Sequence, residues 1–356
     1  MSILTFSFPK LKNITFNFSQ LNQVVGDNTE LKQLLWQVLL WYLSKHKYNE
    51  AELSALDYRE PEILLDGNIL PRTAFKTIVI ESISDVHELL KVKKGTPVYS
   101  ILQNITNNIE ISENIEIINE QLEKMKAKLN DSSILKQING MLSISWKTEI
   151  AYLTASEILQ KKVSMEVFNN NHKSAIEYES ALIKYRVLIN FLRNKLLINV
   201  EPTLLMIKNI DNSLNQQDFN YIMEEINKLT NDFPHFYCII FPSQIGYVYI
   251  NEISIENILV IGEYSYMLES GEDLYKSICN HYPDNNVPTY SMFLKQMQVI
   301  TPYLFSNIQE ANYLSIKNQI LIKIINELYF FYDFKPINVD KITSNEYKFL
   351  YKKSRD

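Results

Sequence analysis

The chain has 356 residues, 46% of them hydrophobic, which is more than one hydrophobic core usually holds, so we expect more than one domain. Its formal net charge of −6 excludes a uniformly basic nucleic-acid-binding surface but permits a locally basic one. The 7 glycines are too scattered for a G-x-G-x-x-G loop, which argues against Rossmann dinucleotide chemistry.

The cysteines and the apolar runs suggest a cellular compartment. Cys238 and Cys279 are far apart and fit no C-x-x-C spacing, so neither a zinc cluster nor a disulfide framework is implied. The N-terminus lacks the pattern of a signal peptide, and the longest apolar run, Leu34 to Leu43, is about half of a bilayer span. We therefore expect a reduced, cytoplasmic protein.

The first 84 residues predict an α/β structure. Alternation over Ile3 to Phe8 and Ile14 to Phe18, around a Pro-Lys turn, predicts an edge hairpin. A helix is predicted from Thr29 to Tyr48, and the β-branched run from Lys76 to Ile83 predicts a strand.

From residue 85 to 145 the composition shifts to Asn, Ile, Glu and Lys with helical spacing, which predicts a helical arm. Its apolar residues recur every three or four positions, at Ile115, Ile118, Leu122, Met125 and Leu129. Such a stripe either packs inside one helical hairpin, which is the simpler interpretation, or forms a seam with a partner.

Residues 146 to 265 return to an α/β pattern. An apolar strand at 204–207, a helix at 216–229 and a strand at 235–243 follow one another closely, which predicts parallel pairing. Strand-like alternation continues from Tyr247 to Ile261. Two helical patterns, at 291–305 and 312–332, predict an appended helical module within residues 266–356.

The segment GDNTELKQ, Gly26 to Gln33, matches the phosphate loop G-x-x-x-x-G-K-[ST] only in part. It keeps the first glycine and the lysine, but Leu31 replaces the second glycine and Gln33 replaces the hydroxyl residue that binds magnesium. We expect Lys32 to be an exposed lysine in the first helical turn rather than a phosphate ligand. The residues assigned to this degenerate loop are Gly26, Asn28 and Lys32.

A second degenerate motif follows the strand at 204–207. An ABC-type ATPase carries there an Asp that holds magnesium through water and a Glu that orients the attacking water. Here Lys208 and Asn209 replace them, and lysine cannot ligate magnesium while asparagine cannot act as a base. No histidine follows the next strand, so we expect no catalysis and no ATP. The other nearby acids are interpreted as a turn residue and a solvated helix face: Asp211, Glu224 and Glu225.

With these motifs, the chain resembles the large variant of the Csn-two family, the type II-A CRISPR-Cas adaptation proteins. The resemblance rests on VVGDNTELKQLL, LLMIKNIDNSLN, QQDFNYIMEEINKL and CIIFPSQ, and on the order in which a helical arm interrupts the α/β part. It covers about residues 14 to 265. It implies a degenerate ABC-ATPase-like (P-loop-like) head at 1–84 and 146–265, an inserted arm or leg at 85–145, and a C-terminal helical extension at 266–356.

The resemblance also implies a function. Proteins of this family are non-catalytic, and they form ring-shaped homotetramers whose lysine-lined hole takes double-stranded DNA by its ends. They support spacer acquisition in antiviral defence beside the adaptation integrase and the effector nuclease. Shorter members bind calcium near the base of the legs, but the matching region here, NGMLSISWKTE, keeps only Glu149, which puts calcium in doubt and leaves any metal ligands unknown.

A ring reconciles the acidic net charge with DNA binding, because only the inner surface has to be basic. No helix-turn-helix or zinc-finger pattern is visible, so binding should be independent of base sequence. The simpler interpretation of each lysine cluster is a solvated helix face, and KVKKG at 91–95 is the best candidate for DNA contact. The candidate DNA-binding residues are Lys91, Lys93, Lys94, Lys124, Lys126, Lys128, Lys136, Lys161 and Lys162.

Two other functions stay open at this point. One is an active P-loop ATPase or nucleotide switch, which would need Lys32 and a substitute for the missing acids to contact nucleotide. The other is a scaffold protein whose arm and C-terminal helices assemble partners without DNA.

Overall fold

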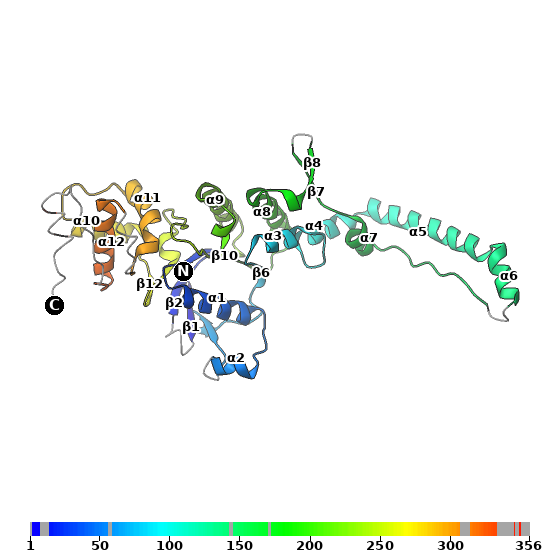
Figure 1. The fold of residues 1–356 in the computed structure, drawn as a ribbon, viewed down its shortest axis with the longest axis horizontal. Coiled ribbons are helices and arrows are strands. Elements are labelled where there is room, and N and C mark those ends of the chain that lie inside the picture. The colour runs from blue at the N-terminus through cyan, green and yellow to red at the C-terminus, as the bar shows by residue number, and fades with distance from the viewer. Residues whose placement is uncertain are drawn as a thin grey trace. The chain divides into compact units, whose positions relative to one another are not determined.

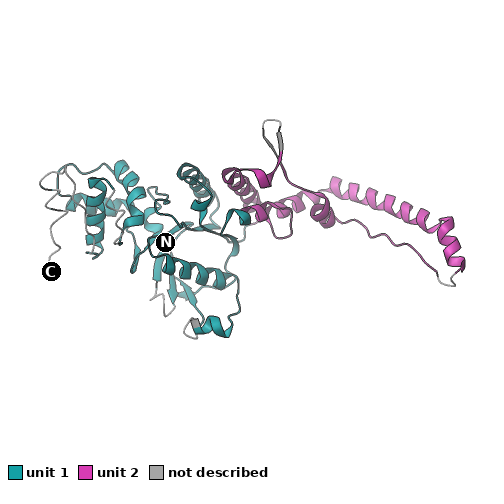
Figure 2. Ribbon diagram, in the orientation of Figure 1, with its two compact units in different colours: residues 1–85, 200–356 teal, residues 86–199 magenta. Residues whose placement is uncertain are grey.

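The computed structural model describes residues 2–7, 14–55, 59–141, 145–169, 172–306 and 314–332, with residues 345 and 349 (Figure 1). It divides into two compact units, unit 1 (residues 1–85 and 200–356) and unit 2 (residues 86–199) (Figure 2). Residues 146–199, which the sequence placed in the head, thus belong to the same unit as the predicted arm. The C-terminal residues from 266 onward fall in unit 1.

Unit 1 contains a six-stranded sheet in the order β12-β11-β3-β10-β9-β6. Its strands are β3 (Leu21–Val25), β6 (Lys76–Ile80), β9 (Thr203–Lys208), β10 (Phe236–Phe241), β11 (Ile258–Ile261) and β12 (Ser265–Met267). All neighbouring pairs are parallel except β11 with β12. Helix α9 (Gln216–Asp232) joins β9 to β10, so the parallel pairing predicted there is confirmed.

A smaller antiparallel sheet in the order β2-β1-β4-β5 also belongs to unit 1. It consists of β1 (Ser2–Ser7), β2 (Ile14–Phe18), β4 (Glu62–Leu65) and β5 (Asn68–Ile69). The predicted pairing of β1 with β2 is confirmed, although β1 lies inside the sheet and only β2 lies at its edge. Asp66 and Gly67 both have positive φ, which suits the two-residue turn between β4 and β5.

Helix α1 (Thr29–Leu43) packs between the two sheets, and its buried Trp36 and Leu39 share one core with residues of β1, β2, β9 and β10. The helix ends five residues before the predicted Tyr48. Lys45 takes a left-handed conformation with φ of 57°, which ends a helix as a glycine usually does. The short helix α2 (Glu50–Ala55) follows.

The C-terminal helices α10 (Gly271–His281), α11 (Tyr290–Ile300) and α12 (Ile316–Leu328) form a second core. This core includes Val25 of β3 and Val260 of β11, so the helices are packed directly on the large sheet. The sequence predicted α11 and α12 but not α10.

The segment before β11 differs from the sequence prediction. Strand-like alternation was expected from residue 247, but only β11 is a strand, and the short 3-10 helix η4 (Ile255–Asn257) precedes it. The buried amide of Gln23 on β3 holds this segment, since it donates to the Tyr249 carbonyl (2.6 Å) and accepts from the Tyr249 N–H (2.9 Å). A side chain thus replaces the ladder of hydrogen bonds that a strand would make.

Unit 2 contains helices and one hairpin. Helix α3 (Ile83–Leu90) leads into it, followed by α4 (Pro97–Thr106), α5 (Ile109–Asn130), α6 (Ser133–Met141), α7 (Ala155–Lys162) and α8 (Ala181–Ile198). Strands β7 (Glu166–Asn169) and β8 (His172–Ala175), which the sequence did not predict, pair in antiparallel fashion. Helix α4 packs against α7 and α8 and buries Val98 and Tyr99.

The long helix α5 has no buried residue, and the chain returns along α5 and α6 as an extended segment, residues 145–154, instead of the expected second helix. Three arm asparagines each bind both backbone groups of one residue in that segment; we call these the asparagine clamps. The amide nitrogen donates to the carbonyl and the amide oxygen accepts the N–H, in the pairs Asn119–Leu153 (3.1 and 2.8 Å), Asn130–Thr148 (3.0 and 2.7 Å) and Asn139–Trp146 (3.0 and 2.6 Å).

Candidate functional site

The degenerate loop at the start of α1 is bound tightly to the end of β11. Gly26 has φ of +112°, and a Cβ there would lie 2.2 Å from the Ile261 carbonyl oxygen, so only glycine fits. The Asn28 side chain accepts from the Leu31 N–H (3.0 Å), which caps α1, and donates to the Gly262 carbonyl (3.0 Å). Both residues of the loop therefore have a structural explanation that involves no ligand.

Lys32 is buried, with 9% of its surface exposed, so the expectation of an exposed lysine is wrong. Its Nζ donates to the Pro242 carbonyl (3.4 Å), and burial lowers the pKa of the ammonium group, an effect that Asp211 and Asp27 partly offset. The space beside Gly26 and Lys32 is about 10 Å³. That is roughly one water-sized probe, whereas small-molecule sites enclose about 300 Å³ or more.

Lys208 and Gln33, one from each degenerate motif, bind each other. Lys208, at the end of β9, donates to the side-chain oxygen of Gln33, and its ammonium lies 5.9 Å from the centre of the Trp36 ring. Asn209 has a left-handed backbone with φ of 56°, and its N–H donates to the Phe241 carbonyl (3.0 Å). A contact within the chain thus joins the two degenerate motifs.

Asp211 lies in a 3-10 turn, η3 (Ile210–Asn212), and is only 3% exposed. Its carboxylate accepts from the Ser243 N–H (2.8 Å), the Ser243 hydroxyl (2.6 Å) and the Gln244 N–H (2.7 Å). The sequence identified a turn residue but gave no sign that this carboxylate holds the loop after β10. These three bonds tie the Asp211 carboxylate to the loop after β10.

All nine candidate DNA-binding lysines lie in unit 2. That unit contains fifteen of the 35 basic residues and twelve of the 41 acidic ones, a formal net charge of +3, which leaves −9 for unit 1. Four of the nine form ion pairs: Lys91 with Glu88, Lys126 with Glu123 and Glu149, Lys136 with Asp131, and Lys161 with Glu157. Within the described part of the chain the other five form none: Lys93, Lys94, Lys124, Lys128 and Lys162.

The loop that carries Lys93 and Lys94 is fixed by Thr96. Its hydroxyl donates to the carbonyls of Lys91 and Lys93 (both 2.8 Å) and accepts from the Tyr99 N–H (3.2 Å) at the start of α4. Both lysine side chains are exposed. An ordered loop that holds two exposed ammonium groups loses little entropy when it contacts an anion.

A second lysine pair lies on α7, the helix that packs on α4. The Tyr99 hydroxyl of α4 lies 2.8 Å from the Ser156 hydroxyl in the first turn of α7, and Lys161 and Lys162 lie in the last turn of that helix. Lys124 and Lys128, four residues apart on α5, share a face of the arm.

The region that the resemblance matches to a calcium site of shorter members, where the sequence puts calcium in doubt, is engaged in an ion pair. Glu149 lies 2.8 Å from Lys126, and in the described ranges no three His, Cys, Asp or Glu side chains lie close enough together to hold a metal ion. None of the helices in those ranges is both long enough and apolar enough to span a bilayer.

Comparison with known proteins identifies the family. Residues 6–350 match the family described as CRISPR-associated protein Csn2 subfamily St. The chain therefore belongs to the Csn2 family of CRISPR-associated proteins, which confirms the Csn-two resemblance. Within this family the match is to subfamily St.

The solved structures support the fold. The crystal structure of Stu0660 of Streptococcus thermophilus is 29% identical, covers 98% of each chain and superposes with a TM-score of 0.85. Two other similarities are too weak to carry an argument. They are the Smc head domain bound to the C-terminal domain of ScpA from Pyrococcus furiosus (12% identity, 79% and 99% coverage, TM-score 0.41) and the recombination mediator RecF (15%, 75% and 97%, TM-score 0.33). The search of curated proteins found no match.

Proposed function

We propose that this Csn2-family chain binds double-stranded DNA by its ends, without catalysis, as a ring-shaped homotetramer that supports spacer acquisition in antiviral defence. The separation of charge carries the proposal: all nine candidate lysines fall in unit 2, which has a net charge of +3 in a chain of net charge −6. Membership of a CRISPR-associated family supports the proposed role in antiviral defence and a cytoplasmic location. It also supports the two proposed partners, the adaptation integrase and the effector nuclease.

The proposed binding is electrostatic. Ammonium groups contact phosphate oxygens, which repeat along any duplex, so lysines on a folded surface position DNA without reading its bases. The five lysines without ion pairs are available for this at no cost, whereas a paired lysine such as Lys136 first has to leave its carboxylate. We therefore assign the main contacts to Lys93 and Lys94 before α4, to Lys162 on α7, and to Lys124 and Lys128 on the arm.

The absence of nucleotide chemistry is part of the proposal. Lys32 donates to a carbonyl, Gln33 and Lys208 bind each other, and Asp211 is saturated by three donors. A nucleotide would have to break these contacts and open a space of about 10 Å³. We interpret the loop as the strand-to-helix turn of an ATPase-like head, retained for its structure.

The test uses purified full-length protein, with linear and covalently closed duplex DNA of equal length and sequence, and native mass spectrometry in parallel. We expect a tetramer that retains linear DNA far better than closed DNA, with affinity that falls steeply as salt increases. Equal binding of both forms would contradict entry from ends, and no binding at low salt would refute the DNA function.

The same purified protein distinguishes the two alternative functions, a nucleotide-hydrolysing enzyme and a protein scaffold. ATP hydrolysis that disappears in Lys32→Ala would support an active nucleotide enzyme instead. A monomer that binds protein partners but no DNA would support a scaffold.

A further inference from the structure

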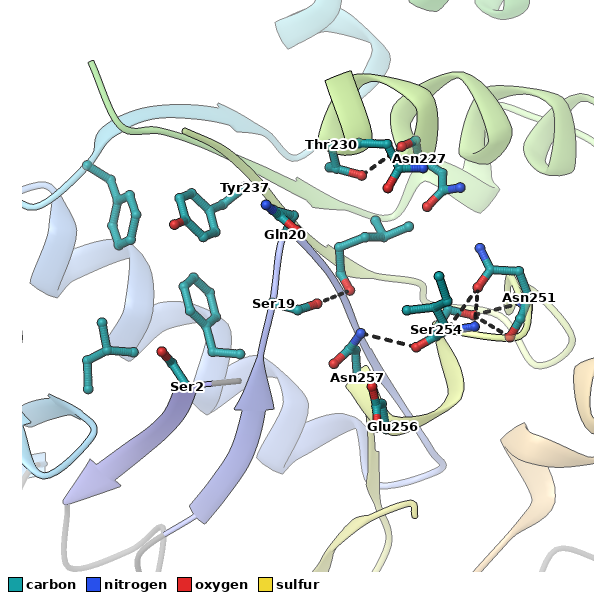
Figure 3. Close-up of a pocket in the computed structure, with 16 residues that line it drawn as sticks. Ser2, Ser19, Gln20, Asn227, Thr230, Tyr237, Asn251, Ser254, Glu256 and Asn257 are labelled. Atoms are coloured by element: carbon teal, nitrogen blue, oxygen red, sulfur yellow. Dashed lines mark hydrogen bonds between the residues drawn. The ribbon is translucent and has the colours of Figure 1, made fainter. Parts of the chain in front are cut away.

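A second concave site lies in unit 1, at the sheet edge opposite the degenerate loop. It is a cavity of about 460 Å³ lined by residues at the amino ends of β3 and β10, including Leu21 and Tyr237 (Figure 3). The degenerate loop follows the carboxyl end of β3, at Gly26. The volume lies within the range of small-molecule sites, which is about 300 to 1,000 Å³.

The lining of this cavity offers acceptors and lacks cations. None of its 16 residues is Lys, Arg or His, and its one acidic side chain is Glu256. In the described part of the chain the Glu256 carboxylate forms neither an ion pair nor a hydrogen bond; only its backbone carbonyl is used, by the Asn17 amide (2.9 Å). A phosphate or carboxylate ligand would therefore meet repulsion from Glu256 with no compensating charge from the side chains of these 16 residues.

Asn257, next to Glu256, has a buried side-chain oxygen that lacks a hydrogen-bond donor among the described residues. Its side chain is 5% exposed; the nitrogen donates to the Ile253 carbonyl (3.4 Å), but Oδ1 has no partner among the described residues. Buried acceptors in folded proteins nearly always have a donor. Figure 3 shows Asn257 beside Glu256 and Ser254 at the edge of the cavity formed by η4. Because Oδ1 is itself buried, a ligand N–H group reaches it only after the Asn257 amide turns toward the cavity, whereas the Glu256 carboxylate is partly exposed.

The β10 side of the cavity is aromatic. The rings of Phe18 and Tyr237 stack with centroids 5.3 Å apart, and Phe75 meets Tyr237 edge-on at 5.2 Å. Aromatic rings attract cations and also pack against the methylene groups that carry them.

We propose that this cavity binds an organic cation, namely a guanidinium or primary ammonium group on an aliphatic chain. The cationic head donates to the Glu256 carboxylate, and the aliphatic part packs on Tyr237 and its aromatic neighbours. Two sources supply this chemistry: a free polyamine, or the arginine or lysine side chain of a peptide.

The experiment is isothermal titration calorimetry on the full-length protein without DNA, with spermidine and with Nα-acetyl-arginine amide as probes. We expect saturable binding of at least one probe, weakened about tenfold or more in Glu256→Gln, because that change removes a charge-assisted hydrogen bond. Glu252→Gln is the matched control, since Glu252 is exposed, lies four residues away and does not line the cavity. Its affinity should equal that of the wild type.

The relative affinity of the two probes identifies the source of the cation. Binding that Glu256→Gln and Glu252→Gln weaken equally would show only general attraction to an acidic protein and would overturn the proposal. Saturation by neither probe at 10 millimolar would overturn it as well. Because the Glu256 carboxylate has no partner among the residues that the structure describes, its variant should keep the melting temperature and DNA binding of the wild type, so this result is independent of the DNA function.

Discussion

Gln33 and Lys208 are 175 positions apart in the chain, and each replaces a residue that a hydrolytic nucleotide site needs for magnesium. Each replacement is uninformative by itself, since glutamine and lysine are common at exposed helix and strand ends. In the fold the two side chains contact each other, so the two positions that the motifs aligned with a magnesium site are joined by a hydrogen bond within the chain. Sequence motifs gave the two positions but could not give the pairing.

Lys32→Met should stabilise the protein slightly. Burial lowers the pKa of Lys32 below its ordinary 10.5, so the unfolded chain binds this proton more tightly than the folded one. The charge therefore costs stability in full at pH values below the folded pKa, and the cost disappears as pH rises past 10.5. We expect the free energy of unfolding at pH 7 to increase by up to about 1 kcal/mol, measured by urea denaturation.

The control for this substitution is Lys47→Met, because Lys47 is exposed and should change stability by less than about 0.5 kcal/mol. The stabilisation should also shrink at pH 11. A loss of more than 1 kcal/mol in Lys32→Met would mean that the ammonium group stabilises the fold.

Asp211→Ala should destabilise the protein by about 2 to 4 kcal/mol, because it leaves the N–H groups of Ser243 and Gln244 without their acceptor. Asp211→Asn keeps one acceptor oxygen and should lose less. Glu224→Ala, on the exposed face of α9, is the control and should change little. If Asp211→Ala unfolds at the same urea concentration as the control, the carboxylate does not hold this loop.

At the scale of elements, the sequence predicted those whose apolar pattern is strong. The unit β9-α9-β10, the β1-β2 pair and helix α1 were all identified from periodicity, because burial on a regular element repeats with that element's period. The end of α1 was missed because Lys45, a residue with no helix-ending tendency, adopts a left-handed conformation. The non-strand character of residues 247–254 was missed because a single buried side chain, Gln23, determines it.

The extended segment at residues 145–154, along which the chain returns beside the arm, could also not be predicted, because individual side chains hold it. The asparagine clamps bind backbone groups, and backbone groups leave no pattern in the sequence of the segment that they hold. Asn119 and Asn130 are 11 residues apart, about three helical turns, so they share one face of α5. That face is polar, whereas the apolar stripe beside it attracted the interpretation of a helical hairpin.

Asn130→Ala should release the extended segment locally without unfolding the protein. It removes the two bonds to the Thr148 backbone and one to the Thr148 hydroxyl (2.7 Å), a loss of about 1 kcal/mol in total at this partly exposed position. We expect hydrogen exchange of the amides at 145–153 to accelerate roughly fivefold.

The matched control is Asn114→Ala on the same helix, because Asn114 donates only to the Glu110 carbonyl of α5 itself. Exchange in the segment should stay at the wild-type rate in this variant. Equal acceleration in both variants would mean that helix propensity, and not the clamp, determines the order of the segment.

At the scale of the whole molecule, the two compact units differ in the sign of their formal net charge. A net charge of −6 conceals +3 in unit 2 and −9 in unit 1. The sequence alone predicted the candidate lysines but not this division, because the boundary at residue 199 follows packing and no change in composition marks it. Which of the lysines are ion-paired could not be predicted either.

The double substitution Lys93→Gln/Lys94→Gln should weaken DNA binding and reduce its salt dependence. Each lost phosphate contact lowers the slope of log affinity against log salt by about 0.9, so the loss of both contacts should reduce it by about 2 per protomer. Fluorescence anisotropy with linear duplex DNA between 50 and 300 millimolar salt measures the slope.

Lys136→Gln is the comparison for this pair, since Lys136 is neutralised by Asp131 at 2.7 Å and should leave the slope almost unchanged. A loss of about 0.9 in Lys136→Gln, the value for one full phosphate contact, would mean that ion pairing within the chain does not govern which lysines reach DNA.

The asparagine clamps join neutral amides to neutral backbone groups. Dissolved ions weaken attraction between charges but hardly affect such bonds at moderate concentration. A salt concentration that releases DNA from the lysines should therefore leave the arm in its native conformation. Under the proposed function, DNA would then be released and bound again as ionic strength changes, while the neutral clamps keep the extended segment in place and only the Lys126–Glu149 ion pair weakens together with the lysine–phosphate contacts.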